Sequence, residues 1–287
     1  MLLGEVERSV VPKTVWRRTS HDAGKWGSRS LREFLGSVSF DYAKSPYAVL
    51  DTLKTIVGQR LNALIVDFFA GSGTTFHATC LLNAEDNGAR RCILVTNNDV
   101  KEEQAKALNK GGVYKGDAEF EKHGIFEAVT RPRCEAVVTG HRADGTPVPG
   151  AYIGGRPLSD GFEENVSFFK LNYLDHDTVD MGKQFAAIAP LLWLDSGAFG
   201  PYDADADTEE QGFSLPVGAK YALLFQESCI GPFLAALAER PDITHVSLVT
   251  NRDDAYAQMR AALPPHLQTR RLYRDYLRSF TLTEPTE

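Results

Sequence analysis

The chain has 287 residues, 43% of them hydrophobic, and a formal net charge of −7. This length suits one large domain or two small ones, and the composition excludes a wholly disordered chain because enough apolar surface is present to form a core. Basic residues concentrate at the amino-terminal end, where residues 1–60 hold ten Lys and Arg against six Asp and Glu. The acidic excess lies in residues 151–287, which we therefore do not expect to face a phosphate backbone.

The sequence also bears on compartment and metal binding. No apolar run approaches the roughly 20 residues of a membrane span, and the acidic start does not resemble a secretory signal. Four cysteines are scattered without a C-x-x-C pair, which argues against a disulfide framework or a zinc cluster. The sequence therefore predicts a cytoplasmic protein without a metal site.

Two buried parallel strands with a helix between them are the clearest expected elements. Before them, a helix is expected over 47–57, because apolar residues recur there at helical spacing after Pro46. Continuous apolar runs at 63–69 and 91–96 predict strands that are covered on both faces, and a helical stretch through Leu82 connects them. Together these segments predict a β-α-β unit with the usual right-handed crossover.

A segment dense in Gly and Pro, 140–161, indicates turns and marks the expected domain boundary. Strand and helix patterns alternate after it, which predicts a second, smaller α/β layer. We therefore expect two domains, residues 1–140 and 141–287. The elements expected in the second are helices at 182–194, 232–240 and 254–263 and strands at 221–225, 245–250 and 269–273.

The motif that carries chemistry lies between the first strand and its helix. This glycine loop reads Asp67-Phe68-Phe69-Ala70-Gly71-Ser72-Gly73-Thr74-Thr75. Two glycines one residue apart let the backbone turn tightly and approach a ligand closely, and the helix that follows points free N–H groups at it. A dinucleotide fingerprint would need glycine where Phe76 stands, and a P-loop would need a lysine that this motif lacks. What remains is an acidic-aromatic turn with two glycines and a Thr-Thr pair.

The glycine loop resembles the S-adenosylmethionine-binding motif of amino-methyltransferases that act on DNA bases, often written D-P-F-x-G-S-G-T-T. Only Phe68 departs from it, where Pro is common. Two flanking segments support the match in order: Phe40-Asp41-Tyr42-Ala43-Lys44-Ser45-Pro46 is similar to the family's preceding motif, and 83–95 is similar to the helix exit and second strand of the adenine-specific beta class. That class includes the modification subunits of Type III restriction systems. The resemblance covers roughly residues 12–135.

The resemblance implies an α/β protein with a partial Rossmann-like, S-adenosylmethionine-dependent methyltransferase fold and a second small α/β domain. It also implies that S-adenosylmethionine is the cofactor. The preceding motif would cover its methionine end, the glycine loop would line it and cap the next helix near its carboxylate, and Asp67 would lie near its amino group. The residues expected to bind the cofactor are Phe40, Lys44, Pro46, Asp67, Phe69, Gly71, Gly73, Thr74, Thr75, Asn97 and Asn98.

Two places in this set carry specific expectations. The family ends its second strand in an acidic residue that accepts the ribose hydroxyls, and here Asn97 or Asn98 stands in that place with Asp99 close behind. An amide oxygen accepts a hydroxyl hydrogen bond, but without charge assistance. At Gly73 we expect a bulky side chain to abolish binding, because its Cβ would enter the cofactor space.

The family's catalytic tetrapeptide, D-P-P-Y or N-P-P-Y, is not found in this sequence. It would hold the amino group of a flipped-out base with an Asp or Asn side chain and a Pro carbonyl, while its aromatic ring stacks on the base. The single Pro-Pro, Pro264-Pro265, lacks the leading Asp or Asn and is typical of a helix stop. In the beta class the tetrapeptide and the target-recognition region precede the glycine loop. We therefore interpret the chain as the carboxy-terminal part of such an enzyme, split, fragmentary or degenerate, with no catalytic residue of its own.

These observations predict the cofactor-binding part of a DNA adenine-N6 methyltransferase of a restriction-modification system. It would act on double-stranded DNA together with a missing segment or a second chain that supplies the tetrapeptide. The alternative is a non-catalytic binding or assembly module that retains the fold. A methyltransferase of small molecules or RNA is disfavoured by the motif order. The Trp, Arg and Lys residues at 16–26 either contact DNA or are ordinary surface residues, and the sequence leaves both open.

Overall fold

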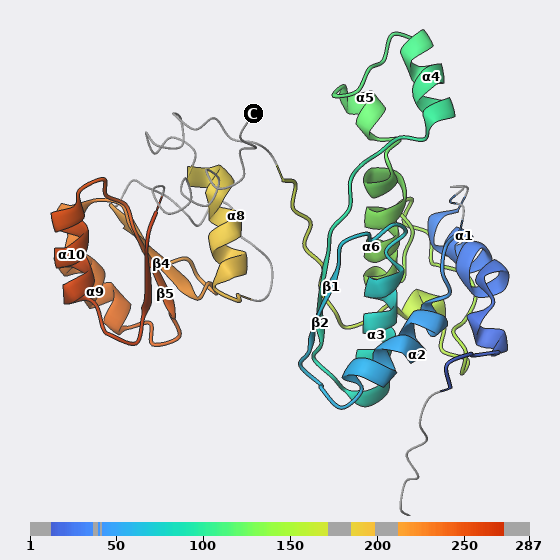
Figure 1. Ribbon diagram of the computed structural model, residues 1–287, viewed down its shortest axis with the longest axis horizontal. Helices are drawn as coiled ribbons and strands as arrows, with labels where there is room; N and C mark the ends of the chain where they lie inside the picture. The colour runs from blue at the N-terminus through green and yellow to red at the C-terminus, as the bar shows by residue number, and fades with distance from the viewer. Residues whose placement is uncertain (1–12, 37–39, 41, 172–184, 199–211, 273–287) are drawn as a thin grey trace, which may run out of the picture. The chain divides into compact units, whose positions relative to one another are not determined.

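The computed structural model describes residues 13–36, 40, 42–171, 185–198 and 212–272 (Figure 1). The chain forms two compact units, Met1–Val166 and Ser167–Glu287. Each unit combines helices with parallel strands, so the protein has a mixed α/β architecture. Within the described ranges, no helix is long and apolar enough to cross a membrane.

The sheet of the first unit has two parallel strands, β1 (Leu64–Asp67) and β2 (Arg91–Leu94), and α3 (Thr74–Asp86) joins them. The predicted β-α-β unit is therefore present. Helix α2 (Pro46–Val57) packs against α3. It begins as its sequence predicts, because Pro46 occupies the first turn and the Ser45 hydroxyl accepts a hydrogen bond from the Tyr47 backbone N–H at 3.2 Å.

The prediction that β1 and β2 are covered on both faces is wrong. Residues along both strands alternate between exposed and half-buried. The exposed fraction is 50% for Leu64, 47% for Val66 and 48% for Ile93, and Val66 pairs directly with Ile93 across the strands. Leu64, Val66, Ile93 and Val95 form what we call the open sheet face. An apolar run indicates that both faces of a strand should be packed against other parts of a protein. In the described part of this unit only one face of the sheet is packed.

Further helices complete the described part of the first unit. Helix α6 packs against α1 and α3, whereas α4 and α5 form an excursion that stands apart from the sheet in Figure 1. The helical segments are η1 (Thr19–His21), η2 (Ala23–Arg29), α1 (Ser30–Leu35), α4 (Glu102–Lys110), α5 (Ala118–Glu121), η3 (Phe126–Thr130), α6 (Arg131–Thr139) and η4 (Leu158–Asp160).

The Gly- and Pro-rich segment, which we expected to begin the second domain, packs with the first unit instead. In this segment, 140–161, the Ile153 backbone N–H donates to the Tyr47 hydroxyl at 2.7 Å. The Tyr152 hydroxyl lies 3.0 Å from Nε2 of His77. The turns thus return buried side chains to the core of the first unit, and the division between the units lies after Val166, beyond the end of this segment.

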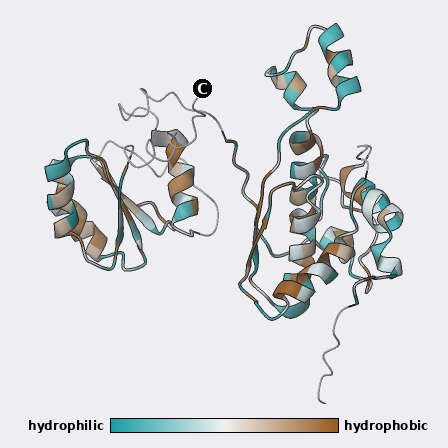
Figure 2. Cartoon of the chain, in the orientation of Figure 1, coloured by the Kyte–Doolittle hydropathy of each residue, from teal (hydrophilic) through white to brown (hydrophobic). Residues whose placement is uncertain are grey.

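The second unit holds a four-stranded sheet in the order β3-β4-β5-β6, in which β3 is antiparallel and the other strands are parallel. Its apolar residues pack on both sides of the fully buried β4, and Figure 2 shows hydrophobic residues along α8 and α9. The predicted alternation of strands and helices is confirmed, and predicted helix residues 182–184 lie outside the described residues. The elements are α8 (Phe185–Asp195), β3 (Phe213–Ser214), β4 (Tyr221–Leu224), η6 (Glu227–Cys229), α9 (Ile230–Ala238), β5 (His245–Leu248), α10 (Asp253–Ala262) and β6 (Gln268–Arg271).

Candidate functional site

The glycine loop turns between the end of β1 and the start of α3. Gly71 and Gly73 have φ angles of +51° and +74°, in the left-handed region that other residues rarely adopt. The Asp67 carboxylate fixes the turn, because it accepts hydrogen bonds from the Phe69 backbone N–H at 3.0 Å and from the Thr75 hydroxyl at 2.6 Å. These bonds tie the end of the strand to the first turn of the helix.

The reason for glycine at position 73 differs from the one expected from the sequence. A Cβ there would lie 3.1 Å from Sγ of Cys134 and 3.6 Å from Cγ2 of Thr130. It would press on α6 and η3, on the inner side of the loop, and would not enter an open space. A Cβ on Gly71 would instead lie 3.9 Å from Cζ of Phe40. Gly71 is therefore the glycine that faces the preceding motif.

Buried polar groups support the loop from behind. The Thr130 hydroxyl donates to the Gly71 carbonyl at 2.6 Å. Arg133 of α6 is 1% exposed, and its Nη1 donates to the carbonyl and the hydroxyl of Ser72 at 3.1 and 3.0 Å and to the Thr74 hydroxyl at 2.9 Å. The loop conformation is thus set by side chains that come from about sixty residues further along the chain.

Arg133 also fixes the tautomer and the protonation state of His77. Nη2 of Arg133 lies 3.3 Å from Nδ1 of His77, and because a guanidinium only donates, Nδ1 accepts. Nε2 then carries the proton and donates to the Tyr152 hydroxyl at 3.0 Å. Burial lowers the pKa of His77 well below its ordinary value, and the charge of Arg133 lowers it further. Burial also lowers the pKa of Arg133 to about 10, so at neutral pH the arginine is charged and the histidine is neutral.

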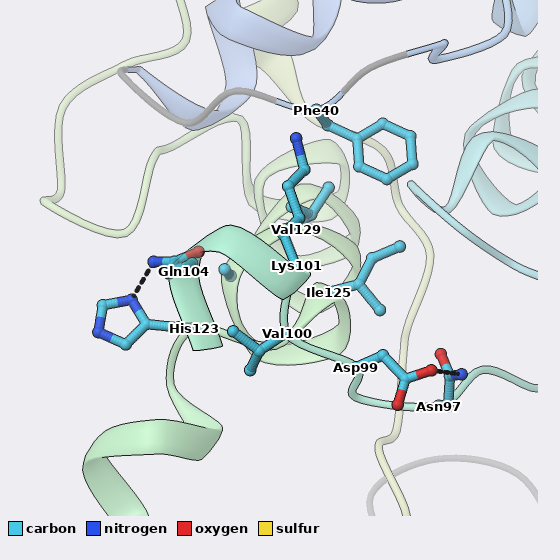
Figure 3. Close-up of a pocket in the computed structure, with 10 residues that line it drawn as sticks. Phe40, Asn97, Asp99, Val100, Lys101, Gln104, His123, Ile125 and Val129 are labelled. Atoms are coloured by element: carbon cyan, nitrogen blue, oxygen red, sulfur yellow. Dashed lines mark hydrogen bonds between the residues drawn. The ribbon is translucent and has the colours of Figure 1, made fainter. Parts of the chain in front are cut away.

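A pocket of about 590 Å³ lies where the chain leaves β2, next to η3 (Figure 3). Phe40 connects it to the glycine loop, since this ring lines the pocket and its Cζ would lie 3.9 Å from a Cβ on Gly71. The lining consists of Phe40, Asn97, Asp99, Val100, Lys101, Gln104, His123, Ile125, Ala128 and Val129. Five of these ten side chains are apolar and five are polar, and a site for a small organic ligand uses both kinds of group.

The polar groups of the pocket are held by one another. The Asn97 side-chain amide donates to the Asp99 carboxylate, as the dashed line in Figure 3 shows. At another part of the lining, the Gln104 amide donates to Nδ1 of His123 at 2.9 Å. The Asp99 carboxylate can accept hydroxyl hydrogen bonds with charge assistance, which the neutral amide of Asn97 cannot provide.

Asn98 has a different role from Asn97. Its amide Nδ2 donates to the carbonyl and the carboxylate of Glu121 at 2.8 and 2.9 Å, and its Oδ1 accepts from the Glu127 backbone N–H at 3.1 Å. These bonds fasten the end of the α4–α5 excursion to the start of η3. Of the two neighbouring amides, Asn97 lines the pocket and Asn98 holds the backbone around it.

The remaining predicted residues divide between surface and interior. Phe69 is 92% exposed and Lys44 is exposed, and neither lines the pocket. Pro46 and Thr74 are buried. Pro46 lies at the start of α2, and the Thr74 hydroxyl accepts the hydrogen bond from Arg133. Among the described residues, no group of three or more His, Cys, Asp and Glu side chains could hold a metal ion.

The first unit is thus an α/β unit with a glycine loop between β1 and α3 and a pocket beyond the end of β2. Sequence comparison relates the chain to restriction-modification methyltransferases. It is 31% identical over 116 residues to the Type III restriction-modification enzyme EcoPI Mod subunit of Escherichia phage P1, which is 40% of this chain and 17% of that protein. No protein-family model matches the sequence.

Two further relatives agree with this relationship. The chain is 35% identical over 86 residues to the Type II methyltransferase M.KpnI of Klebsiella pneumoniae, which is 30% of this chain and 20% of that protein. It is 39% identical over 74 residues to the Type III restriction-modification enzyme StyLTI Mod subunit of Salmonella typhimurium, which is 26% of this chain and 11% of that protein. The matched regions thus span a fifth or less of the length of these relatives.

Proposed function

We propose that this protein is the S-adenosylmethionine-binding part of a site-specific DNA adenine-N6 methyltransferase of a restriction-modification system. The observation that carries the proposal is the position of Phe40, whose ring lines the pocket beyond β2 and lies near Gly71 of the glycine loop. The relationship to Type III Mod subunits and a Type II methyltransferase supports it. In this proposal the first unit is a partial Rossmann-like fold, and the second is a small α/β appendage.

The pocket suits this cofactor in size and chemistry. Its volume of about 590 Å³ falls within the roughly 300–1,000 Å³ that is usual for small-molecule sites. Asp99, held by Asn97, would accept hydrogen bonds from the ribose hydroxyls. Ile125 and Val129 offer an apolar surface to the adenine ring, and the free N–H groups at the start of α3 favour the methionine carboxylate.

When bound, S-adenosylmethionine supplies an electrophilic methyl group for direct transfer to the exocyclic amine of adenine. The residues of this chain would hold and orient the cofactor, which makes the transfer effectively unimolecular once a base lies next to it. The groups that accept the hydrogens of the amine would come from a tetrapeptide that the printed sequence does not contain. We therefore assign no catalytic residue in this chain.

A further segment or a second chain is proposed to complete the site. The open sheet face supports this, because parallel sheets are normally covered on both faces and here four apolar side chains stand exposed on one. Phe68 and Phe69 of the glycine loop, directly after β1, are also exposed and add to this apolar surface. Such a surface is typical of contact with another protein layer. That layer would carry the tetrapeptide, and double-stranded DNA would bind to the completed assembly.

Calorimetric titration of the purified chain with S-adenosylmethionine tests the cofactor assignment. We expect saturable binding that Asp99→Ala weakens about tenfold or more, since a charge-assisted hydrogen bond contributes roughly 1.5–3 kcal/mol. Glu103→Ala, which removes an exposed carboxylate from nearby α4, is the matched control and should bind like the wild type. A well-folded chain that binds no S-adenosylmethionine would refute the assignment.

The alternative function is a binding or assembly module that retains the fold without methyl transfer, and the missing tetrapeptide favours it for the isolated chain. Labelled methyl transfer separates the two. The chain alone should transfer no methyl group to DNA. Addition of a protein that carries D-P-P-Y, encoded by a neighbouring reading frame, should restore transfer if this is a split enzyme, and should leave it absent if this is a module.

A further inference from the structure

Arg133 carries a buried charge that no carboxylate of the described residues balances. Its sequence context, Arg131-Pro132-Arg133, resembles an ordinary charged surface, yet the side chain is 1% exposed. Its hydrogen bonds go to neutral groups of Ser72, Thr74 and His77, and its Nε has no partner within the described part of the chain. In the same ranges no Asp or Glu forms an ion pair with it.

The contrast with a second buried arginine shows that this arrangement is unusual for the protein itself. Arg90 is 3% exposed and lies near the other end of α3, where its Nη2 pairs with the Asp86 carboxylate at 2.8 Å. Removing an ion from water is costly, and neutral hydrogen-bond partners restore only part of the lost hydration. Arg90 has a counter-ion to offset this cost, whereas Arg133 has none among the residues that the structure describes. Fold stability alone therefore does not account for a charge at position 133.

The contacts of Arg133 point to the glycine loop. Nη1 holds Ser72 and Thr74, the two residues that flank Gly73, and so it fixes the peptide groups that turn the chain into α3. The N–H groups of this turn face the direction from which a ligand would meet the helix start. A charge buried beneath them acts over a longer range than it would in water, because the surrounding dielectric is low. Arg133 is thus placed to favour a negative group on the outer side of the loop.

We propose that Arg133 is a positioning residue that holds the glycine loop in its binding conformation and, through its unbalanced charge, strengthens the binding of the anionic, amino-acid end of the ligand. The inference rests on the proposed function, in which that end is the methionine carboxylate. The adenosine end would lie in the pocket at the end of β2, away from Arg133. The two ends of one ligand should therefore respond differently when Arg133 is replaced.

Two ligands separate these ends. S-adenosylhomocysteine carries the carboxylate, and 5′-methylthioadenosine contains the adenosine part without the amino acid. We expect Arg133→Met to lower the affinity for S-adenosylhomocysteine about tenfold or more and the affinity for methylthioadenosine less than about twofold. Arg133→Lys keeps the charge but loses the planar fork, so its effect on S-adenosylhomocysteine should be smaller than that of Arg133→Met. Arg90→Met is the matched control: it should lower the melting temperature and leave the ratio of the two affinities at the wild-type value.

The outcomes are distinct. If Arg133→Met leaves the ratio of the two affinities at the wild-type value, whether both affinities fall equally or neither falls, the inference is overturned and Arg133 is a structural residue. Should Arg133→Met fail to fold, Arg133→Lys decides by the same ratio, with a selective loss of S-adenosylhomocysteine supporting the inference and an equal loss overturning it. If the wild type binds neither ligand, the proposed function itself is refuted.

Discussion

Acid should destabilise the first unit through a single buried histidine. Both ring nitrogens of His77 are engaged, Nδ1 as an acceptor for Arg133 and Nε2 as a donor to the Tyr152 hydroxyl. The rings of Phe34 and Phe162 complete its surroundings at centroid distances of 5.0 and 6.3 Å. Protonation of Nδ1 would remove the acceptor and place a second positive charge beside the guanidinium, with no carboxylate among the described neighbours to balance either.

The size of the effect follows from the lowered pKa of His77. Because the folded chain holds this histidine well below its ordinary pKa of about 6.5, the unfolded chain takes up a proton first as the pH falls. The contribution to stability is complete above that value and is lost as the pH drops below it. Between pH 7.5 and pH 5.5, the loss from this one group is about 1.4 kcal/mol in the free energy of unfolding.

Urea unfolding of the full chain at the two pH values measures this loss. In a Trp193→Phe background the remaining tryptophans, Trp16 and Trp26, both report on the first unit. We expect His77→Gln to remove about 1.4 kcal/mol of the pH dependence, whereas His141→Gln, an exposed control, should keep it. If the pH dependence of His77→Gln matches that of the wild type, the neutral, buried state assigned to His77 is wrong.

Three further outcomes are expected. Gly73→Ala should lower the free energy of unfolding by about 1–3 kcal/mol, and by more than Gly112→Ala, whose Cβ would meet nothing within 4 Å; equal losses would contradict the packing on Cys134. Asn98→Ala should speed hydrogen exchange across α4 and α5 because three hydrogen bonds are lost, and Asn97→Ala should not. Burial raises the pKa of Cys134 to about 12, so alkylation of this thiol should require unfolding, and rapid labelling of the native chain would disprove its burial.

The sequence was sufficient for the order of the elements around the glycine loop. A β-α-β unit follows from two apolar runs, a turn that needs left-handed glycines and one helical stretch between them, all of which are local signals. Which segments pack on the two faces of these strands is not determined by local sequence. The run that includes Leu64 and Val66 requires apolar contacts on both faces, but which segment or chain provides them depends on the whole assembly.

The parts of the site that sequence reasoning missed come from distant segments. Arg133 gave no signal, because an arginine two positions from Arg131 and from Glu135 normally predicts a charged surface. Nothing in the local pattern separated Asn97, which lines the pocket, from Asn98, which fastens the neighbouring backbone, since neighbouring residues with similar side chains differ only in the tertiary partners that they meet. Asp99, which stands close behind these two amides, is absent from the predicted set of binding residues although it follows the second strand within reach of the same edge.

Helix α3 is anchored at both ends, by Arg133 at its first turn and by Arg90 near its last. A helix held in this way opens only together with the unit that contains it, so its amide hydrogens should be among the slowest to exchange. The excursion of α4 and α5 is different, because α4 buries none of its residues. Gln104 of α4 lines the pocket, so motion of this excursion would change how far the pocket opens while α3 stays in place, and a proposed ligand would enter and leave at the rate of that motion.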